Sequence, residues 1–243
     1  MKWYIQNIKK EHSELQEVHR LLKTAGQCIV EVGLKDGNLW NASDSQYITQ
    51  ETDTAIFLGS YSVGRLFQKI SPDAVFDLDE YTYSDWTEIF GAQNVLNADA
   101  YVGHSSAIPW DGSHLFVRPL HDDKAFNGAI FSENSLSYDG LVVASSIKTI
   151  FSESRCFVVD GRVVTSSLYK LNGEFHTSGV VDGDVIEFAQ CMANRFTHSG
   201  FSIDVAKTPE GLKIVELNCL NYSGFYSANL AKLIDALLMH YGE

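Results

Sequence analysis

The residues whose types and spacing could perform chemistry lie near the end of the chain, where the pattern predicts a β-hairpin over residues 201–218. Two alternating runs are joined by a Pro-Glu-Gly turn. If that turn is centred on Glu210, Asp204 lies opposite Glu216 on the neighbouring strand. Because side chains alternate along a strand, Asn218 then projects from the same face.

Three oxygen-bearing side chains on one face of a hairpin could bind a metal ion. Two adjacent carboxylates repel each other unless a cation lies between them, and oxygen ligands suit a hard ion such as Mg²⁺. A bound metal triphosphate would supply the remaining ligands. The opposite face, with Val215, Leu217 and Cys219, is expected to belong to the core. The alternative interpretation is a solvated hairpin face in an acidic protein.

Two further segments place basic side chains on predicted strands. Residues 115–120 are an apolar run interrupted by Arg118-Pro119. Residues 153–164 contain two β-branched runs joined by Asp-Gly, a strong hairpin signal, and this pattern puts Arg155 on the first strand. Phosphoryl transfer needs positive charge around the transferred group, and the planar guanidinium of arginine can hold phosphate or carboxylate through two hydrogen bonds. An ordinary surface charge is the alternative for each cation.

In their order along the chain, these segments resemble the ATP-grasp superfamily, the fold of many carboxylate-amine ligases. The resemblance covers roughly residues 113–227. Val-Arg118-Pro resembles the strand ending in Val-Lys-Pro whose basic residue contacts nucleotide phosphates. The segment 153–164 resembles the hairpin whose arginine faces the reacting phosphate in ligases that extend peptides with glutamate. With Lys124, the two arginines make the chain especially similar to a compact, phage-type clade with two arginines and one lysine at its site.

The resemblance implies an α+β protein: an ATP-grasp fold, with two α+β subdomains enclosing the nucleotide, preceded by a small α/β domain. It implies ATP and Mg²⁺ as cofactors and a ligase that forms an amide through an acyl-phosphate. The implied metal ligands are Asp204, Glu216 and Asn218. The implied catalytic residues are Arg155, Arg118 and Lys124, with Arg155 steering the substrate carboxylate. The implied nucleotide-binding residues are Arg118, Lys124, Val143, Ala144, Ser145, Ser146 and Glu153.

The chain also departs from the family pattern. Arginine replaces the commoner lysine at position 118, residues 119–128 replace the usual glycine-rich lid, and Leu220 stands where several relatives have a polar group. The acceptor pocket therefore cannot be inferred from any relative. Two other classes remain open: a nucleotide-binding regulatory module of the same fold, favoured by the altered lid, and a sugar- or peptide-binding α/β protein with an acidic hairpin.

Composition limits the partners. The chain has 243 residues and a formal net charge of −13, with 31 acidic and 18 basic residues, which argues against a broad nucleic-acid surface or attraction to an anionic membrane. No apolar run is long enough to span a membrane, so we expect a cytoplasmic protein. The resemblance implies small-molecule or peptide carboxylates and amines as its partners. The pattern gives no oligomeric state. The four cysteines have no metal-ligand spacing and are expected to be buried, reduced thiols.

The elements that must position these residues divide into two predicted domains, an α/β domain over residues 1–112 and a catalytic domain over residues 113–243. A β-α start and two further strands are expected first, then a packed linker over residues 71–110 with one short helix. The catalytic domain is expected to contain strands at residues 115–118 and 141–145, the two hairpins, and helices at residues 184–196 and 227–239. The aromatic residues Tyr222, Phe225 and Tyr226 are expected to pack rather than to stack on a base.

Overall fold

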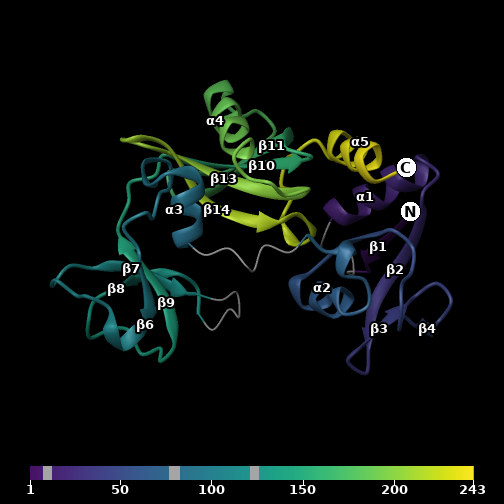
Figure 1. Cartoon of the computed structure of the whole chain (residues 1–243), viewed down its shortest axis with the longest axis horizontal. Helices are drawn as coiled ribbons and strands as arrows, with labels where there is room; N and C mark the ends of the chain where they lie inside the picture. Colours follow the sequence, from purple (N-terminus) through teal and green to yellow (C-terminus); the bar gives the residue numbers. More distant parts are fainter. Residues whose placement is uncertain (8–12, 77–82, 121–125, 243) are drawn as a thin grey trace.

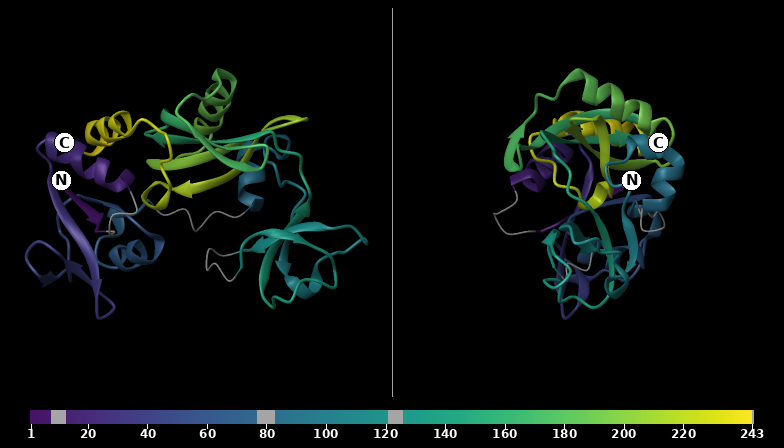
Figure 2. Two further views of the ribbon diagram at one scale, coloured as in Figure 1. Left: turned by 180° about the vertical axis from the view of Figure 1, so that it is seen from behind. Right: turned by 90° about the vertical axis from the view of Figure 1, so that its left-hand side faces the viewer.

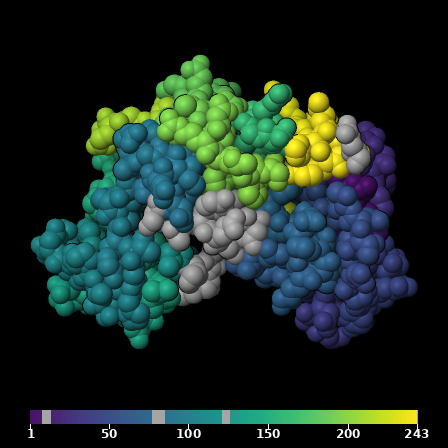
Figure 3. Space-filling view, in the orientation of Figure 1, coloured from purple at the N-terminus to yellow at the C-terminus, as the bar shows by residue number. Residues whose placement is uncertain are grey.

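In the part of the chain that the structure describes, helices pack against three β-sheets (Figure 1). The computed structural model describes residues 1–7, 13–76, 83–120 and 126–242. The middle sheet and the N-terminal sheet lie on the same side of the C-terminal sheet, as Figure 2 shows from behind and from one end. In the space-filling view of Figure 3, the green surface of the C-terminal sheet and its helix forms the top of the molecule, with the other two sheets as lobes below.

The N-terminal sheet has the strand order β4-β3-β2-β1-β5, with β1 parallel to both β2 and β5. The bounds are β1 (Lys2–Gln6), α1 (Ser13–Thr24), β2 (Cys28–Lys35), β3 (Asn38–Asn41), β4 (Gln46–Tyr47), β5 (Ala55–Leu58) and α2 (Tyr61–Gln68). The predicted β-α start and the two following strands are confirmed. Strands β3 and β4 were not predicted; the chain reverses into β3 through Asp36 and Gly37, with φ of 52° and 76°.

The middle sheet has the order β6-β9-β7-β8 and is antiparallel throughout. Its strands are β6 (Tyr101–His104), β7 (Leu115–Pro119), β8 (Ala129–Phe131) and β9 (Leu141–Ser146). Strands β7 and β9 were predicted. Strand β6 lies in the segment that was expected to be a linker, yet it pairs with β9, which follows the boundary expected after residue 112. The division of the chain into two domains at that boundary stays a prediction.

Between α2 and β6 lie the short helices η1 (Pro72–Ala74), α3 (Tyr83–Phe90) and η2 (Ala92–Asn94), and η3 (Ser105–Ala107) follows β6. Helix α3 contributes Trp86 and Phe90 to the core of the C-terminal sheet. After η2, a single parallel bridge joins Val95 to Ile214, and the amide of Leu96 donates to the carbonyl of Ile214 at 2.8 Å. These contacts fix the start of the middle segment against the edge of the C-terminal sheet.

The C-terminal sheet has the order β12-β11-β10-β13-β14, with every pair antiparallel. Its elements are β10 (Ser152–Val159), β11 (Arg162–Leu171), β12 (Glu174–Ser178), α4 (Gly183–Ala193), β13 (Gly200–Thr208), β14 (Gly211–Cys219), η4 (Leu220–Tyr222) and α5 (Leu230–Tyr241). Both predicted hairpins and both predicted helices are present. Helix α4 packs on Cys156 and Val158 of β10, whereas α5 packs with Phe157 and Val159, which alternate to the other face.

Asn221 joins the end of the C-terminal sheet to the N-terminal sheet. Its Nδ2 donates to the carbonyls of Phe57 and Ala74, and its Oδ1 accepts from the amide of Phe76 at 2.7 Å. The residue is 2% exposed, so these bonds are shielded from water. The segment that follows β14 is therefore anchored directly against the N-terminal part of the chain.

The cysteines differ from the expectation that all four are buried. All are free thiols; Cys156 is buried, but Cys28 and Cys191 are exposed. Apolar patterning suggested burial, whereas Cys28 is the exposed first residue of β2 and Cys191 occupies an exposed position of α4. None of the helices that the structure describes has both the length and the apolar character required to cross a bilayer.

Candidate active site

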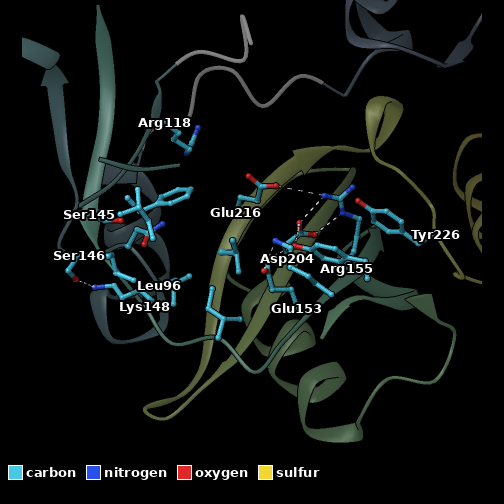
Figure 4. A pocket seen from close by; sticks show the side chains of 18 residues that line it. Leu96, Arg118, Ser145, Ser146, Lys148, Glu153, Arg155, Asp204, Glu216 and Tyr226 are labelled. Atoms are coloured by element: carbon cyan, nitrogen blue, oxygen red, sulfur yellow. Dashed lines mark hydrogen bonds and ion pairs between the residues drawn. The ribbon is translucent and has the colours of Figure 1, made fainter. Parts of the chain in front are cut away.

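One row of three charged side chains crosses the centre of the C-terminal sheet. Arg155 of β10 lies opposite Asp204 of β13, and Asp204 lies opposite Glu216 of β14. The sequence predicted the pairing of the two carboxylates, and the structure confirms it. Because cross-strand partners project from the same face, all three side chains reach the cleft drawn in Figure 4.

A β-bulge at Val215 brings the two carboxylates into register. Close to the turn, β13 pairs with Ile214 in a register that differs by one residue from the register joining Asp204 to Glu216. Two successive residues therefore face the same side: Val215 and Glu216 both line the cleft, while Ile214 and Leu217 lie in the core. The expectation that Val215 lies on the core face is wrong, because strict alternation fails at the bulge.

The Arg155 guanidinium is held by Asp204 and by two aromatic rings. Its Nε donates to Oδ1 and its Nη2 donates to Oδ2 of Asp204, each at 2.8 Å. The rings of Tyr169 and Tyr226 are stacked with centroids 5.1 Å apart and lie 5.6 Å and 5.4 Å from the guanidinium carbon. Burial alone would lower the pKa of Arg155, but the charge and hydrogen bonds of Asp204 outweigh that effect and raise it. The guanidinium therefore stays protonated.

Tyr169 connects this ion pair to a second one. Its hydroxyl lies 2.8 Å from Oε2 of Glu153 and 3.1 Å from Oδ2 of Asp204. The Nζ of Lys170 lies 2.9 Å from the other oxygen of Glu153. Burial, together with the charges of Asp204 and Glu153, raises the pKa of Tyr169, so the hydroxyl stays protonated. Its single O–H donates a hydrogen bond to one carboxylate at a time.

Sequence reasoning missed Tyr169 and Lys170 because their placement depends on a second bulge. Glu153 pairs with Lys170, whereas Ser154 pairs with Leu168, so Tyr169 is left between the two registers. Both Tyr169 and Lys170 consequently line the cleft. Nothing in the residue types of β11 marks this irregularity, so the sequence contained no signal that could have found them.

Glu216 lies at the open side of the row. Desolvation within the cleft and the charge of Asp204 raise the pKa of Glu216, although 37% of its side chain remains exposed. Its Oε1 accepts from Asn218 Nδ2 at 3.1 Å and lies 3.8 Å from Nη2 of Arg155. Asn218 thus contacts Glu216 without itself lining the cleft.

The donor atoms of this face fit a hard cation. A cation beside Glu216 would relieve the repulsion from Asp204 that contributes to the raised pKa. The amide nitrogen of Asn218 is used by Glu216, which leaves its oxygen as the atom suited to a metal. Among the described residues, no group of three or more His, Cys, Asp and Glu side chains could hold a metal. An ion here would therefore depend on the amide oxygen and on the ligand as well.

The opposite wall of the cleft comes from the middle sheet and the segment that follows it (Figure 4). Arg118 of β7 lines this wall, and its Nη1 donates to the carbonyl of Pro119 at 3.2 Å. Ser146 and Lys148 are fixed by Asp99, whose carboxylate oxygens lie 2.6 Å and 2.8 Å from Ser146 Oγ and Lys148 Nζ. The wall thus carries cations that face the carboxylates across the cleft.

The cleft has a volume of about 480 Å³, and apolar as well as charged side chains line it. That size is typical of small-molecule sites. Its apolar lining consists of Leu96, Phe116, Ile130, Ile147, Ile150 and Val215.

The structure brings most of the predicted site residues together. Arg118, Ser145, Ser146, Glu153, Arg155, Asp204 and Glu216 all line the cleft. Val143 and Ala144 do not: they are 3% and 2% exposed and lie on β9, which pairs with a strand on each side. Lys124 lies outside the described residues. Tyr226 lines the cleft, whereas its neighbour Phe225 packs in the core as expected.

Comparison with known proteins identifies related chains. Residues 70–237 match the model of a family described as "ATP-grasp domain, R2K clade family 3". No curated protein shows a significant match to the chain.

Solved structures match over nearly the whole chain. The ATP-grasp ligase PsnB, complexed with minimal precursor, Mg and ADP, shares 12% identity with a TM-score of 0.60, covering 100% of this chain and 98% of that one. The macrocyclase MdnC from Microcystis aeruginosa MRC, bound with precursor peptide MdnA, shares 10% identity with a TM-score of 0.59, covering 99% and 100%. D-alanyl-alanine synthetase A from Vibrio cholerae O1 shares 12% identity with a TM-score of 0.61, covering 100% and 94%. The predicted ATP-grasp fold is confirmed.

Proposed function

Because the chain belongs to the ATP-grasp domain family of R2K clade family 3, we propose that it is an ATP-dependent ligase that joins a carboxylate to an amine. The observation that carries this proposal is the row of Arg155, Asp204 and Glu216, which faces Arg118 across one cleft. Carboxylates for a metal and cations for phosphates are thereby collected where a nucleotide could lie between them.

The nucleotide would occupy the cleft with its base against the apolar lining and its phosphates near Arg118. A planar base fits between apolar side chains such as Phe116 and Val215, and the segment fixed by Lys148 borders this region. Lys124 is proposed as a second phosphate-binding cation. Asp204, Glu216 and Asn218 would hold Mg²⁺, which supplies neutralisation of phosphate charge when bound. PsnB has been solved with Mg and ADP, which supports this assignment.

The proposed reaction has two steps. A carboxylate oxygen of the substrate attacks the γ-phosphorus of ATP, the bond from that phosphorus to the β-γ bridging oxygen breaks, and ADP leaves with the negative charge. The amine nitrogen then attacks the carbonyl carbon of the acyl-phosphate. Phosphate departs with the bonding electrons, and the nitrogen loses a proton, which leaves an amide.

Arg155 could orient the substrate carboxylate without releasing Asp204. Its Nε and Nη2 edge is used by Asp204, whereas the hydrogen bond that Nη1 donates among the described residues is a 3.5 Å contact with the carbonyl of Gly224. A ligand oxygen could replace that weak contact and accept a charge-assisted hydrogen bond from Nη1. The acid and amine are proposed to be small molecules or peptides; PsnB has been solved with precursor peptide PsnA2 and MdnC with precursor peptide MdnA.

A nucleotide-binding regulatory module is the second candidate. The observation that favours it is the pair in which both oxygens of Asp204 already accept from Arg155, which opposes approach of another cation. Such a module would bind nucleotide without joining two substrates.

Two measurements test the proposal. Addition of Mg²⁺ and ATP should raise the melting temperature, because a ligand that binds only the folded state stabilises it. Mixtures of amino acids and peptides should then stimulate ADP release. No melting shift would overturn the nucleotide site, whereas a shift without ADP release under any mixture would favour the regulatory module. Glu216→Ala should abolish both responses while the protein stays folded.

A further inference from the structure

We propose that Glu14, at the start of α1, is a positioning residue for the cleft, acting through the loop at residues 224–226. Glu14 lies outside the part of the chain that matches the family model, which begins at residue 70. The proposal rests on the proposed function, since it concerns how Arg155 is held for the ligase reaction.

Glu14 binds two successive backbone amides of that loop. Its Oε2 accepts from the amide of Phe225 at 3.0 Å, and its Oε1 accepts from the amide of Tyr226 at 2.9 Å. Hydrogen bonds to a carboxylate are stronger than those between neutral groups. Tyr226 has a φ of 54°, in the left-handed region that a tyrosine rarely adopts. Such a conformation persists only when surrounding contacts fix it, and the two bonds to Glu14 are contacts of that kind.

The same loop contacts Arg155 twice. The ring of Tyr226 lies 5.4 Å from the guanidinium carbon and stacks on Tyr169, and the carbonyl of Gly224 lies 3.5 Å from Nη1. Figure 4 shows the Tyr226 ring beside the end of the Arg155 side chain. A displacement of the loop would therefore alter both the aromatic support of Arg155 and the Nη1 side proposed to receive the substrate.

The helix that carries Glu14 is itself rigidly placed. Val18 and Leu22 of α1 share a buried cluster with Leu233 and Leu237 of α5, and Phe225 belongs to the same cluster. Helices α1 and α5 lie side by side in Figures 1 and 2. Packing of α1 thus fixes the position of Glu14, and Glu14 in turn binds the loop. Through these contacts the N-terminal part of the chain contributes to the geometry of the site.

The nucleotide-facing wall is built separately, from Arg118, Ser146 and Lys148 on the other side of the cleft. Loss of the Glu14 contacts should therefore affect substrate orientation and turnover more than nucleotide binding. A purely structural role of Glu14 in α1 predicts a different result: lower stability with unchanged turnover of the folded protein.

The test compares Glu14→Gln with Glu17→Gln in the full chain. A glutamine at position 14 keeps one acceptor oxygen but places an amino group against a backbone N–H, so one bond of the pair is lost. Glu17 lies on the same helix and contacts Arg20 instead of the loop. Glu17→Gln therefore removes the same charge from α1 as Glu14→Gln but leaves the contacts to the loop in place. Calorimetry with Mg²⁺-ADP measures nucleotide affinity, and ADP release from Mg²⁺-ATP with a mixture of the twenty amino acids and short peptides measures turnover. A 3-fluorotyrosine at position 226 reports the loop by ¹⁹F NMR.

For Glu14→Gln we expect a shifted or broadened fluorine signal, Mg²⁺-ADP affinity within twofold of wild type, and ADP release lower by about tenfold or more, as misplacement of catalytic groups produces. Glu17→Gln should match wild type in all three. Turnover of the double variant Glu14→Gln/Tyr226→Ala should be less than twofold below that of Tyr226→Ala alone, because both substitutions act through one loop.

The outcomes separate the inference from the proposed function. An unchanged fluorine signal in Glu14→Gln, or a changed signal with wild-type turnover, overturns the role of Glu14 while leaving the ligase intact. Fully multiplicative effects in the double variant overturn action through the loop. If wild-type protein binds no Mg²⁺-ADP, the proposed function fails and the positioning role of Glu14 in that function fails with it.

Discussion

Arg155 and Asp204 face each other on adjacent antiparallel strands and form two hydrogen bonds of 2.8 Å on the side of the sheet that lines the cleft. The Asp204 side chain is fully buried and that of Arg155 is 9% exposed. In such a place each charge depends on the other, because a buried ion without a partner is strongly destabilising. The pair therefore determines stability as well as the geometry of the proposed site.

Arg155→Ala should consequently destabilise the protein by about 3–5 kcal/mol, the usual cost of breaking a buried ion pair by removing one partner. Urea denaturation measures this change. Arg162 lies exposed on the same hairpin, so Arg162→Ala is the matched control and should leave the midpoint almost unchanged. If Arg155→Ala unfolds at the wild-type midpoint, the pair does not exist in solution as described. Turnover of the variant must be measured under conditions where it remains folded.

Glu216→Gln should change how stability depends on pH. The raised pKa of Glu216 means that the folded state retains this proton to a higher pH than the unfolded state does. Stability without ligand therefore falls as pH rises from the unfolded pKa through the folded pKa, and stays lower above it. The variant should lose this contribution and be more stable than wild type at neutral pH.

Urea denaturation across that pH range, without metal, checks the Glu216 prediction. Glu210→Gln, in the exposed turn of the same hairpin, provides a control with the same charge change. Mg²⁺-ATP binding should show the reverse order, because the amide is a poorer ligand than a carboxylate for a hard cation. A Glu216→Gln variant that is both less stable and unimpaired in nucleotide binding would contradict the site.

Arg118→Lys tests whether a directed contact explains the arginine at this position. A lysine keeps the charge but cannot form the two parallel hydrogen bonds of a guanidinium, which should cost about 1–3 kcal/mol of transition-state stabilisation. Turnover at saturating ATP should then fall by roughly tenfold to a hundredfold. A lysine variant as fast as wild type removes the argument for a directed contact, and an alanine variant as fast as wild type removes Arg118 from the site.

The sequence predicted the parts of the site that depend on local patterns. Residue types and a turn signal were enough to place Arg155 on a strand. The pairing of Asp204 with Glu216 was predicted from a turn centred on Glu210, whereas the turn lies at Pro209-Glu210 and the register beside it differs by one residue. The pairing depends on a bulge at Val215, which periodicity cannot locate, because a bulge is selected by packing across the whole sheet. Tyr169 was missed for the same reason.

Glu14 could not be found from the sequence for a different reason. Its two hydrogen bonds join it to Phe225 and Tyr226, which lie 211 and 212 positions further along the chain. No local pattern predicts such a contact, which exists only because α1 and α5 pack together. Likewise, β6 was expected within a linker because residues 71–110 are rich in Asp, Tyr and Trp. Its pairing with β9 depends on the middle sheet as a whole.

The hydroxyl of Tyr169 gives a final prediction. It is the one group in contact with both Glu153 and Asp204 among the hydrogen bonds described for these carboxylates. Tyr169→Phe keeps the ring that stacks on Tyr226 and removes only the donor, so Arg155 retains its aromatic support. A hydrogen bond to a charged group contributes about 1.5–3 kcal/mol, and we expect a loss of stability in that range.

Turnover of Tyr169→Phe should fall as well, because the carboxylates beside Arg155 lose a fixed hydrogen-bond donor. Tyr4→Phe is the control: Tyr4 of β1 also donates to a shielded carboxylate, that of Glu51 between β4 and β5, and neither residue lines the cleft. Both variants should be less stable in urea, but only Tyr169→Phe should release ADP more slowly when folded. Equal turnover in the two variants would show that the Tyr169 hydroxyl stabilises the fold without positioning the site.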